Sequence, residues 1–261
     1  MRPQQASDTR DWPESVEVLN ECGRSPVVLV CEHASNHIPA EYDGLGLDAK
    51  MLDDHIAWDI GAAALTHALS RKLDAAAFLG NYSRLLIDLN RPVHVATSVP
   101  RRSEATDIPG NRALSAAETL RRVRHIFNPF HARVQSCLDE RQIAGIPTML
   151  ISIHSFTPVY HEVPRPWHAG VLFNRSKAGG EAIARRLAEE PGIDVGCNVP
   201  YKVDAESDYC IPVHGEARGL AAVLIEVRND GLRSRRGIDE WADRLTAAIG
   251  ALHPEHMTLA P

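Results

Sequence analysis

Residues 26–37 read PVVLVCEHASNH, an apolar run that stops at charged and polar side chains. A short run of this kind, rich in valine, is typical of a strand buried on both faces of a sheet. Comparable runs occur along the chain: AAAFL (75–79), RLLIDL (84–89), PTMLISIH (147–154), AGVLFN (169–174) and AAVLIEV (221–227). Helical patterns lie between them. Strands that alternate with helices predict an α/β fold with a largely parallel sheet.

Four segments show the apolar spacing of helices, namely 60–73, 115–143, 177–190 and 238–252. The second begins with Ser115-x-x-Glu118, which is a capping-box pattern. Pro129 falls inside the same segment, so we expect a kink or a break there. The stretches 92–112 and 198–218 fit neither a helix nor a strand. In a compact domain, loops of that length are usually functional or disordered.

The bulk composition describes a soluble globular protein of 261 residues, 44% of them hydrophobic. No repeat or linker is evident, so we expect a single domain over 1–261, with 1–25 as a peripheral segment. Those 25 residues lack an apolar core typical of secretory signals, and no apolar run is long enough for a membrane span, which predicts a cytoplasmic protein. The net charge of −6 argues against nucleic-acid binding. The sequence does not indicate an oligomeric state.

Cysteines offer neither a disulfide framework nor a metal cluster. The five of them are scattered, and no C-x-x-C pair occurs.

Polar side chains follow several of the predicted strands. His33 follows the first, Asn90 and Arg91 follow RLLIDL, His154 ends PTMLISIH, and Glu226 lies near the end of the last. If the strands are parallel, these residues meet at one edge of the sheet, where α/β enzymes bind their ligands.

His33 and His154 are candidate metal ligands. Two imidazoles and a carboxylate form a zinc-type set that leaves a position open for water. The third ligand is open among Asp59, Asn36 and Asp54, although a neutral amide is a poor ligand for zinc.

Glu226 has two interpretations. Beside a metal, it would accept a proton from water and pass it to the leaving group. Alternatively, it is a buried carboxylate paired with Arg228, which lies on the same strand face. Arg228 is in addition a candidate for substrate binding.

Arg84 and Arg91 flank an apolar run, and Asn90 adjoins the second of them. The guanidinium fork matches a carboxylate in a bidentate manner, and an amide adds a further donor. These residues therefore favour a cleft that binds an anionic substrate.

Five motifs together carry a family resemblance: CEHASNHIP (31–39), HIAWDIGA (55–62), SRLLIDLNRP (83–92), SIHSFTP (152–158) and LIEVRND (224–230). In this order they resemble the N-formylglutamate amidohydrolase family over about residues 26–230. That family is similar in fold to zinc carboxypeptidases and aspartoacylase. The resemblance implies a three-layer α/β/α sandwich with a mixed sheet.

The resemblance also implies roles for individual residues. In the related enzymes two histidines hold zinc, an Asn-Arg pair grips the substrate carboxylate, a late glutamate is the base, and an upstream arginine contacts the scissile carbonyl or a carboxylate. The matching positions here are His33, His154, Asn90, Arg91, Glu226 and Arg84. The carboxypeptidase relatives have glutamate three residues after the first histidine, where this chain has Asn36. Asp59 is therefore our choice for the third ligand.

The activity that follows is hydrolysis of an N-acyl amino acid, a small-molecule substrate, with zinc or another divalent metal. N-formyl-L-glutamate, which the family cleaves to formate and glutamate in histidine degradation, is the substrate we expect. Two alternatives stand beside it. One is a hydrolase of another N-acyl amino acid or short peptide, and the other is a non-catalytic binding protein for acidic metabolites.

Overall fold

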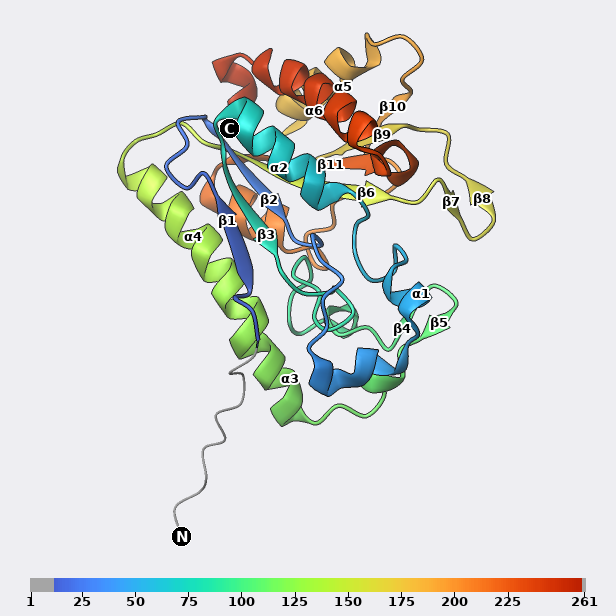
Figure 1. Cartoon of the computed structure of the whole chain (residues 1–261). Coiled ribbons are helices and arrows are strands. Elements are labelled where there is room, and N and C mark those ends of the chain that lie inside the picture. Colours follow the sequence, from blue (N-terminus) through green and yellow to red (C-terminus); the bar gives the residue numbers. More distant parts are fainter. Residues whose placement is uncertain (1–11, 260–261) are drawn as a thin grey trace.

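The computed structural model describes residues 12–259, which are built around a central seven-stranded sheet (Figure 1). The strand order is β1-β3-β2-β6-β11-β9-β10. Its strands are β1 (Val16–Leu19), β2 (Val27–Cys31), β3 (Ala76–Gly80), β6 (Met149–Phe156), β9 (Ala169–Leu172), β10 (Val195–Cys197) and β11 (Ala221–Arg228). Two small hairpins stand apart from it, β4 (Arg102–Ser103) with β5 (Thr106–Asp107) and β7 (Val159–Tyr160) with β8 (Val163–Pro164).

The sheet is mixed and largely parallel, as expected. Strands β3, β2, β6 and β11 run parallel to one another, whereas the outer strands β1 and β9 are antiparallel to β3 and β11, respectively. Residues 16–19 of the predicted peripheral segment form the edge strand β1. Residues 1–11 of that segment lie outside the described residues.

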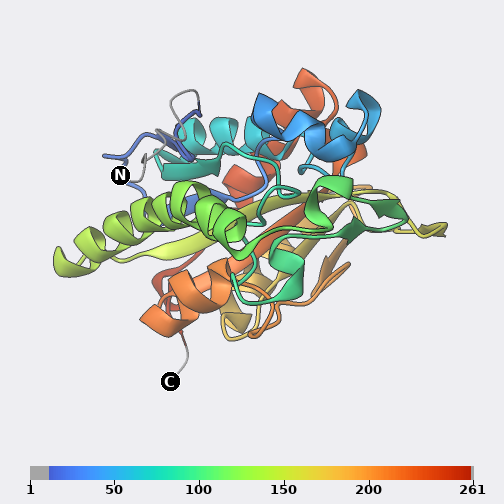
Figure 2. The ribbon, with the colours of Figure 1, turned by 90° about the horizontal axis from the view of Figure 1, so that it is seen from below.

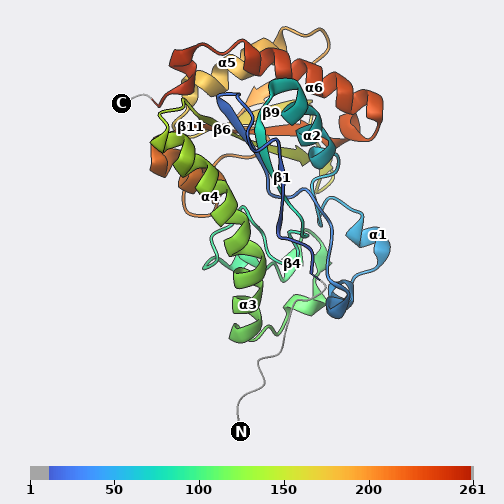
Figure 3. The same cartoon turned by 60° about the vertical axis from the view of Figure 1, so that its left-hand side comes forward.

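Helices cover both faces of the sheet and make three layers (Figure 3). On one face lie α2 (Ala62–Leu73), α5 (Lys177–Ala188) and α6 (Arg235–Gly250). On the other lies α4 (Asn128–Ile143), with the helical turns of residues 210–218 beside it (Figure 2). Alternate residues of β2 divide between the two cores: Val27 and Leu29 pack under α2, and Val28 and Val30 face α4. This alternation is why the strands read as continuous apolar runs.

The predicted helix over 115–143 is interrupted before Pro129. It comprises α3 (Ala116–Arg122), a π-helical turn (Val123–Phe127) and α4. Ser115 Oγ accepts a hydrogen bond from the Glu118 N–H at 3.1 Å, so the predicted cap is present. Pro129 lies in the first turn of α4, where its missing N–H costs least. A short α1 (Ala49–Leu52) completes the α-helices, and over residues 12–259 no helix is long and apolar enough to cross a membrane.

The prediction of a strand at 84–89 was wrong. The segment is a buried chain of turns whose apolar side chains pack under α4. Three of its carbonyls accept hydrogen bonds from side chains instead of from a neighbouring strand. Arg122 Nη1 donates to Leu86 O at 2.8 Å, Asn111 Nδ2 to Leu85 O at 2.8 Å, and His131 Nε2 to Leu89 O at 2.9 Å. Buried carbonyl groups need hydrogen-bond donors, and here the side chains of Asn111, Arg122 and His131 supply them.

Two buried histidines, His131 in α4 and His214 in the π-helical turn Cys210–Gly215, lie beside this segment. Because His131 Nε2 donates to Leu89 O, its Nδ1 accepts from His214 Nε2 at 2.9 Å. Burial, with a contribution from His214, lowers the pKa of His131 from 6.5 to about 3. Burial, with the nearby Arg218, lowers that of His214 to about 4. Both rings are therefore neutral in the folded protein at neutral pH.

The histidine pair predicts acid destabilisation. In the unfolded chain both imidazoles take up protons near pH 6.5, so this part of the stability is complete above that pH. It falls as the pH drops from 6.5 toward 4, by up to about 1.4 kcal/mol per pH unit for each ring. Denaturant unfolding at pH 6.5 and 5.0 measures the slope. His214→Gln, which keeps a donor for His131, should reduce the slope, and an unchanged slope would contradict the assignment.

Candidate active site

A cavity of about 510 Å³ opens beyond the carboxyl ends of β2, β6 and β11. Its volume is within the range of small-molecule sites. Parts of both long unassigned stretches line it, with Thr97, Pro100 and Glu104 from the first and Tyr201 and Asp208 from the second. The loops that carried no secondary-structure signal therefore build the walls of this cavity.

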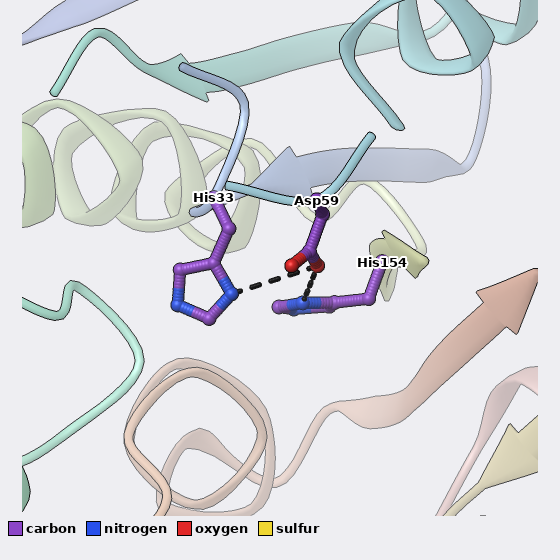
Figure 4. Close-up of side chains that lie close together, drawn as sticks. All are labelled: His33, Asp59 and His154. Carbon is purple, nitrogen blue, oxygen red and sulfur yellow. Dashed lines mark hydrogen bonds and ion pairs between the residues drawn. The ribbon is translucent and has the colours of Figure 1, made fainter. Parts of the chain in front are cut away.

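His33, Asp59 and His154 meet at the bottom of the cavity (Figure 4). His33 follows β2, His154 lies in β6, and Asp59 precedes α2. Asp59 Oδ2 lies 2.7 Å from His154 Nδ1 and 3.6 Å from His33 Nδ1. One ligand atom from each residue falls within 4.8 Å of the others, and all three residues are buried.

Two further carboxylates lie behind the histidines. Asp88 Oδ1 lies 2.7 Å from His33 Nε2, and Glu32 Oε2 lies 3.1 Å from His154 Nε2. A proton on His33 Nε2 is thereby fixed toward Asp88, which turns the lone pair of Nδ1 toward Asp59. That Nδ1 atom is buried and has no hydrogen-bond partner among residues 12–259. A carboxylate behind a histidine is the usual support of a metal ligand, so this donor set fits a divalent cation.

The electrostatics of the cluster also favour a bound cation. Burial alone would raise the pKa of Asp59, but the imidazoles of His33 and His154 outweigh it and hold the pKa well below its ordinary value. Burial alone would lower the pKa of His154, yet Glu32 and Asp59 raise it well above 6.5. The carboxylates thus remain ionised and attract positive charge, either a proton or a metal ion.

The two other candidates for the third ligand point elsewhere. Asn36 Nδ2 donates to Leu52 O at 3.0 Å and to Asp53 Oδ1 at 3.1 Å. Asp54 accepts from the backbone and ring nitrogens of His55. Of the three candidates, the fold brings Asp59 to the histidines.

Glu226 lies beside the metal-type cluster on the neighbouring strand. It is the register partner of His154 across the parallel pair β6–β11, and its side chain lines the cavity. Its Oε2 atom is buried and has no hydrogen-bond partner among residues 12–259. Burial, which the positive charge of His154 opposes, raises the pKa of Glu226 to about 7. A carboxylate with this pKa is suited to exchanging protons near neutral pH.

Arg84 reaches the same cavity from the buried segment. Its Nη1 donates to Asp59 Oδ1 at 3.3 Å and its Nη2 to Asp88 Oδ2 at 3.0 Å. The arginine thus ties the carboxylate beside the histidines to the carboxylate that supports His33. It places a positive charge at the cavity wall.

Asn90 and Arg91 also line the cavity, directly after Asp88 and Leu89. Arg91 Nη1 contacts Asp208 Oδ1 and donates to Ser207 O at 3.3 Å. Arg228 is not brought to the cavity. Its guanidinium donates to Asp230 and to the carbonyls of residues 165–167, and it does not pair with Glu226.

Sequence reasoning missed Glu32, Asp88 and Asp208. Glu32 and Asp88 could have been noticed as carboxylates that adjoin or interrupt apolar runs, since a buried carboxylate needs a partner. Asp208 lies in a loop 117 residues from Arg91, and no local pattern connects the two.

Known proteins resemble this chain in sequence and in fold. The family model of N-formylglutamate amidohydrolase matches residues 25–233. A solved structure of a gene product from Agrobacterium tumefaciens is 38% identical, covers 91% of this chain and 94% of its own, and has a TM-score of 0.88. No curated protein matches significantly.

A second solved structure, N-formylglutamate amidohydrolase from Ralstonia eutropha, is 18% identical, with 94% and 98% of the two chains covered and a TM-score of 0.63. At this identity the likeness concerns the fold, and the sandwich described above is shared. The family model spans most of the chain and includes all the motifs quoted above. The chain belongs to the N-formylglutamate amidohydrolase family and is an amidohydrolase.

Proposed function

We propose that this protein hydrolyses an N-acyl amino acid, specifically N-formyl-L-glutamate, with a divalent metal such as zinc. The observation that carries the proposal is the buried group of His33, Asp59 and His154 beside Glu226. All four side chains line the cavity that also contains Asn90 and Arg91. This combination supplies metal ligands, a base and carboxylate-binding groups in one space.

His33, Asp59 and His154 would hold the metal ion. When bound, zinc lowers the pKa of water and polarises a carbonyl group. Glu226 accepts a proton from the water that attacks the formyl carbon, and transfers it to the amine nitrogen as the C–N bond breaks. The products are formate and glutamate. Arg84 contributes positive charge at the cavity wall as negative charge develops on the carbonyl oxygen.

Asn90 and Arg91 would hold the α-carboxylate of the substrate. Asn90 is buried and Arg91 half-buried, so their hydrogen bonds to an anion would be partly shielded from water. Charged hydrogen bonds are stronger in such surroundings.

Metal analysis and a substrate panel test the proposal. Protein purified without chelators should contain about one zinc-like ion per chain, the number expected of a three-ligand site. Release of free amine should be fastest from N-formyl-L-glutamate. It should be slower from both N-acetyl-L-glutamate and N-formyl-L-leucine. Full activity in metal-free protein would contradict the mechanism. Tight binding of these compounds without hydrolysis would instead indicate a binding protein.

Arg91→Lys should be damaging although it keeps the charge. Lysine cannot reproduce the guanidinium fork, and loss of one charge-assisted hydrogen bond costs about 2 kcal/mol, roughly 30-fold in kcat/KM. The α-amide of N-formyl-L-glutamate lacks the anion, so it should be a poor substrate of the wild type and lose little more in the variant. Steady-state kinetics with both substrates decide the matter. An equal loss for both would assign Arg91 to the fold or the transition state.

A further inference from the structure

The segment 207–210 contacts both Asn90 and Arg91, the two residues proposed to bind the substrate carboxylate. Ser207 and Asp208 contact Arg91, while the backbones of Tyr209 and Cys210 contact Asn90. This segment leads into the π-helical turn Cys210–Gly215, which packs against β6 and β11. The two donors therefore take their orientation from a part of the chain distant in sequence.

Asn90 is fixed in one orientation by two backbone donors. Its Oδ1 accepts from the N–H of Tyr209 at 3.2 Å and from the N–H of Cys210 at 2.9 Å. Two N–H groups require an oxygen at that position, so the other end of the amide is Nδ2. Over residues 12–259 no acceptor is hydrogen-bonded to Nδ2. The amide thus offers a donor to a ligand in the cavity that Asn90 lines.

Arg91 is held at one end of its guanidinium. Nη1 meets three oxygens, those of Asn90 O at 3.1 Å, Ser207 O at 3.3 Å and Asp208 Oδ1. Within the described part of the chain, Nε and Nη2 have no hydrogen-bond partner. These two N–H groups are the pair that can donate to both oxygens of one carboxylate.

Asp208 is fully engaged by the protein. Its Oδ1 contacts Arg91, and its Oδ2 accepts from the N–H of Asp204 at 2.7 Å. The Asp204 side chain in turn accepts from the N–H groups of Glu206 and Ser207, which stabilises the loop without touching Asn90 or Arg91. Both oxygens of Asp208 thus contact the protein, one of them the Arg91 guanidinium.

We propose that Asp208 is a positioning residue, which fixes Arg91 with its open N–H pair beside the Asn90 amide and so completes a subsite for the substrate α-carboxylate. This inference rests on the proposed function for the identity of the ligand. The alternative is that Asp208 competes with the substrate carboxylate for the Arg91 guanidinium. The two roles predict opposite changes in substrate affinity when Asp208 is replaced.

Kinetics of Asp208→Ala and Asp208→Asn separate these roles. With N-formyl-L-glutamate, Asp208→Ala should raise KM about 10-fold and change kcat less than about 2-fold, since the chemistry is remote from the contact. Asp208→Asn keeps one acceptor without the charge, so its KM should lie between those of wild type and Asp208→Ala. With the α-amide substrate, neither variant should change KM more than about 2-fold. A lower KM for N-formyl-L-glutamate in either variant would show competition and overturn the proposal.

Asp204→Ala is the matched control for a loosened loop. It removes two hydrogen bonds from the same loop and leaves Asp208 on Arg91, so KM should stay within about 2-fold of wild type. If Asp204→Ala and Asp208→Ala raise KM equally, or if Asp208→Ala lowers kcat alone, Asp208 has only a structural role.

Calorimetric binding of L-glutamate keeps this test separate from the proposed reaction. Wild type should bind it, and Asp208→Ala should weaken binding about 10-fold. If wild type fails to hydrolyse N-formyl-L-glutamate but shows this binding difference, the proposed substrate is wrong and the positioning role stands. If wild type does not bind L-glutamate, or both proteins bind it equally, the carboxylate subsite is overturned.

Discussion

Glu226→Gln is expected to lower kcat by about 10²–10⁴-fold, for N-formyl-L-glutamate and for its α-amide alike. Glutamine has nearly the shape of glutamate, but it cannot accept a proton from water or return it to the leaving amine. The loss should fall on both substrates because proton transfer does not depend on the α-carboxylate. Steady-state kinetics of the purified variant measure it.

Metal content is the control for Glu226→Gln. Glu226 is the register partner of His154 and is not a member of the three-residue ligand group, so metal content should remain near that of wild type. If the metal is lost together with activity, Glu226 serves the metal site. If kcat hardly changes, another group is the base.

Asp59→Ala should lose both metal and activity. The carboxylate offers the only formal negative charge among the three proposed ligands, and two neutral imidazoles alone bind a divalent ion weakly. We expect metal content after dialysis to fall below about a tenth of wild type and kcat/KM to fall at least about 10³-fold, because the proposed metal would supply much of the rate. Elemental analysis and kinetics on the same preparation test both effects.

Asn36→Ala is the matched comparison, since Asn36 was another candidate for the third ligand. Here its side chain contacts Leu52 and Asp53, so metal content should be largely retained. Circular dichroism and Asp59→Asn, which keeps the side-chain shape, exclude a folding defect as the cause. Loss of metal in Asn36→Ala with retention in Asp59→Ala would show that the ligand assignment is wrong.

Much of the fold is readable from the sequence because apolar content determines burial. The runs at 26–31 and 221–227 become β2 and β11, with residues that alternate between two cores. Strand direction is not readable in this way. β9 is as apolar as β6 but runs antiparallel to β11, because direction depends on the path of the connecting loops.

The segment at 84–89 shows the main limit of the method. Its apolar side chains indicate burial correctly, yet they do not reveal what pairs with its backbone. The partners are side chains of Asn111, Arg122 and His131, distant along the chain. A pattern confined to the run itself cannot distinguish a buried strand from a buried loop.

The candidate site, like the fold, is only partly predictable from the sequence. The sequence predicts that His33 and His154 lie together, because polar residues at strand ends converge on one sheet edge. Asp59, which precedes a helix, was chosen among three candidates only through the family resemblance. Glu32 and Asp88, which lie behind the two histidines, were missed, because an apolar run marks a carboxylate as buried but does not show which side chain it contacts. Their roles depend on distances between side chains, which only the folded chain defines.

The carbonyl groups of Leu86 and Leu89 accept hydrogen bonds from side chains of the helical segment 116–143. This restricts which substitutions that segment tolerates. In a sheet, any residue except proline supplies the backbone N–H that a neighbouring carbonyl needs. Behind this loop the donors are Arg122 and His131, so the identity of each side chain matters. Substitutions there never meet the substrate, yet they alter the support of the loop that carries Asn90 and Arg91. The geometry of the loop that lines the cavity therefore depends on Arg122 and His131, two side chains that do not themselves line it.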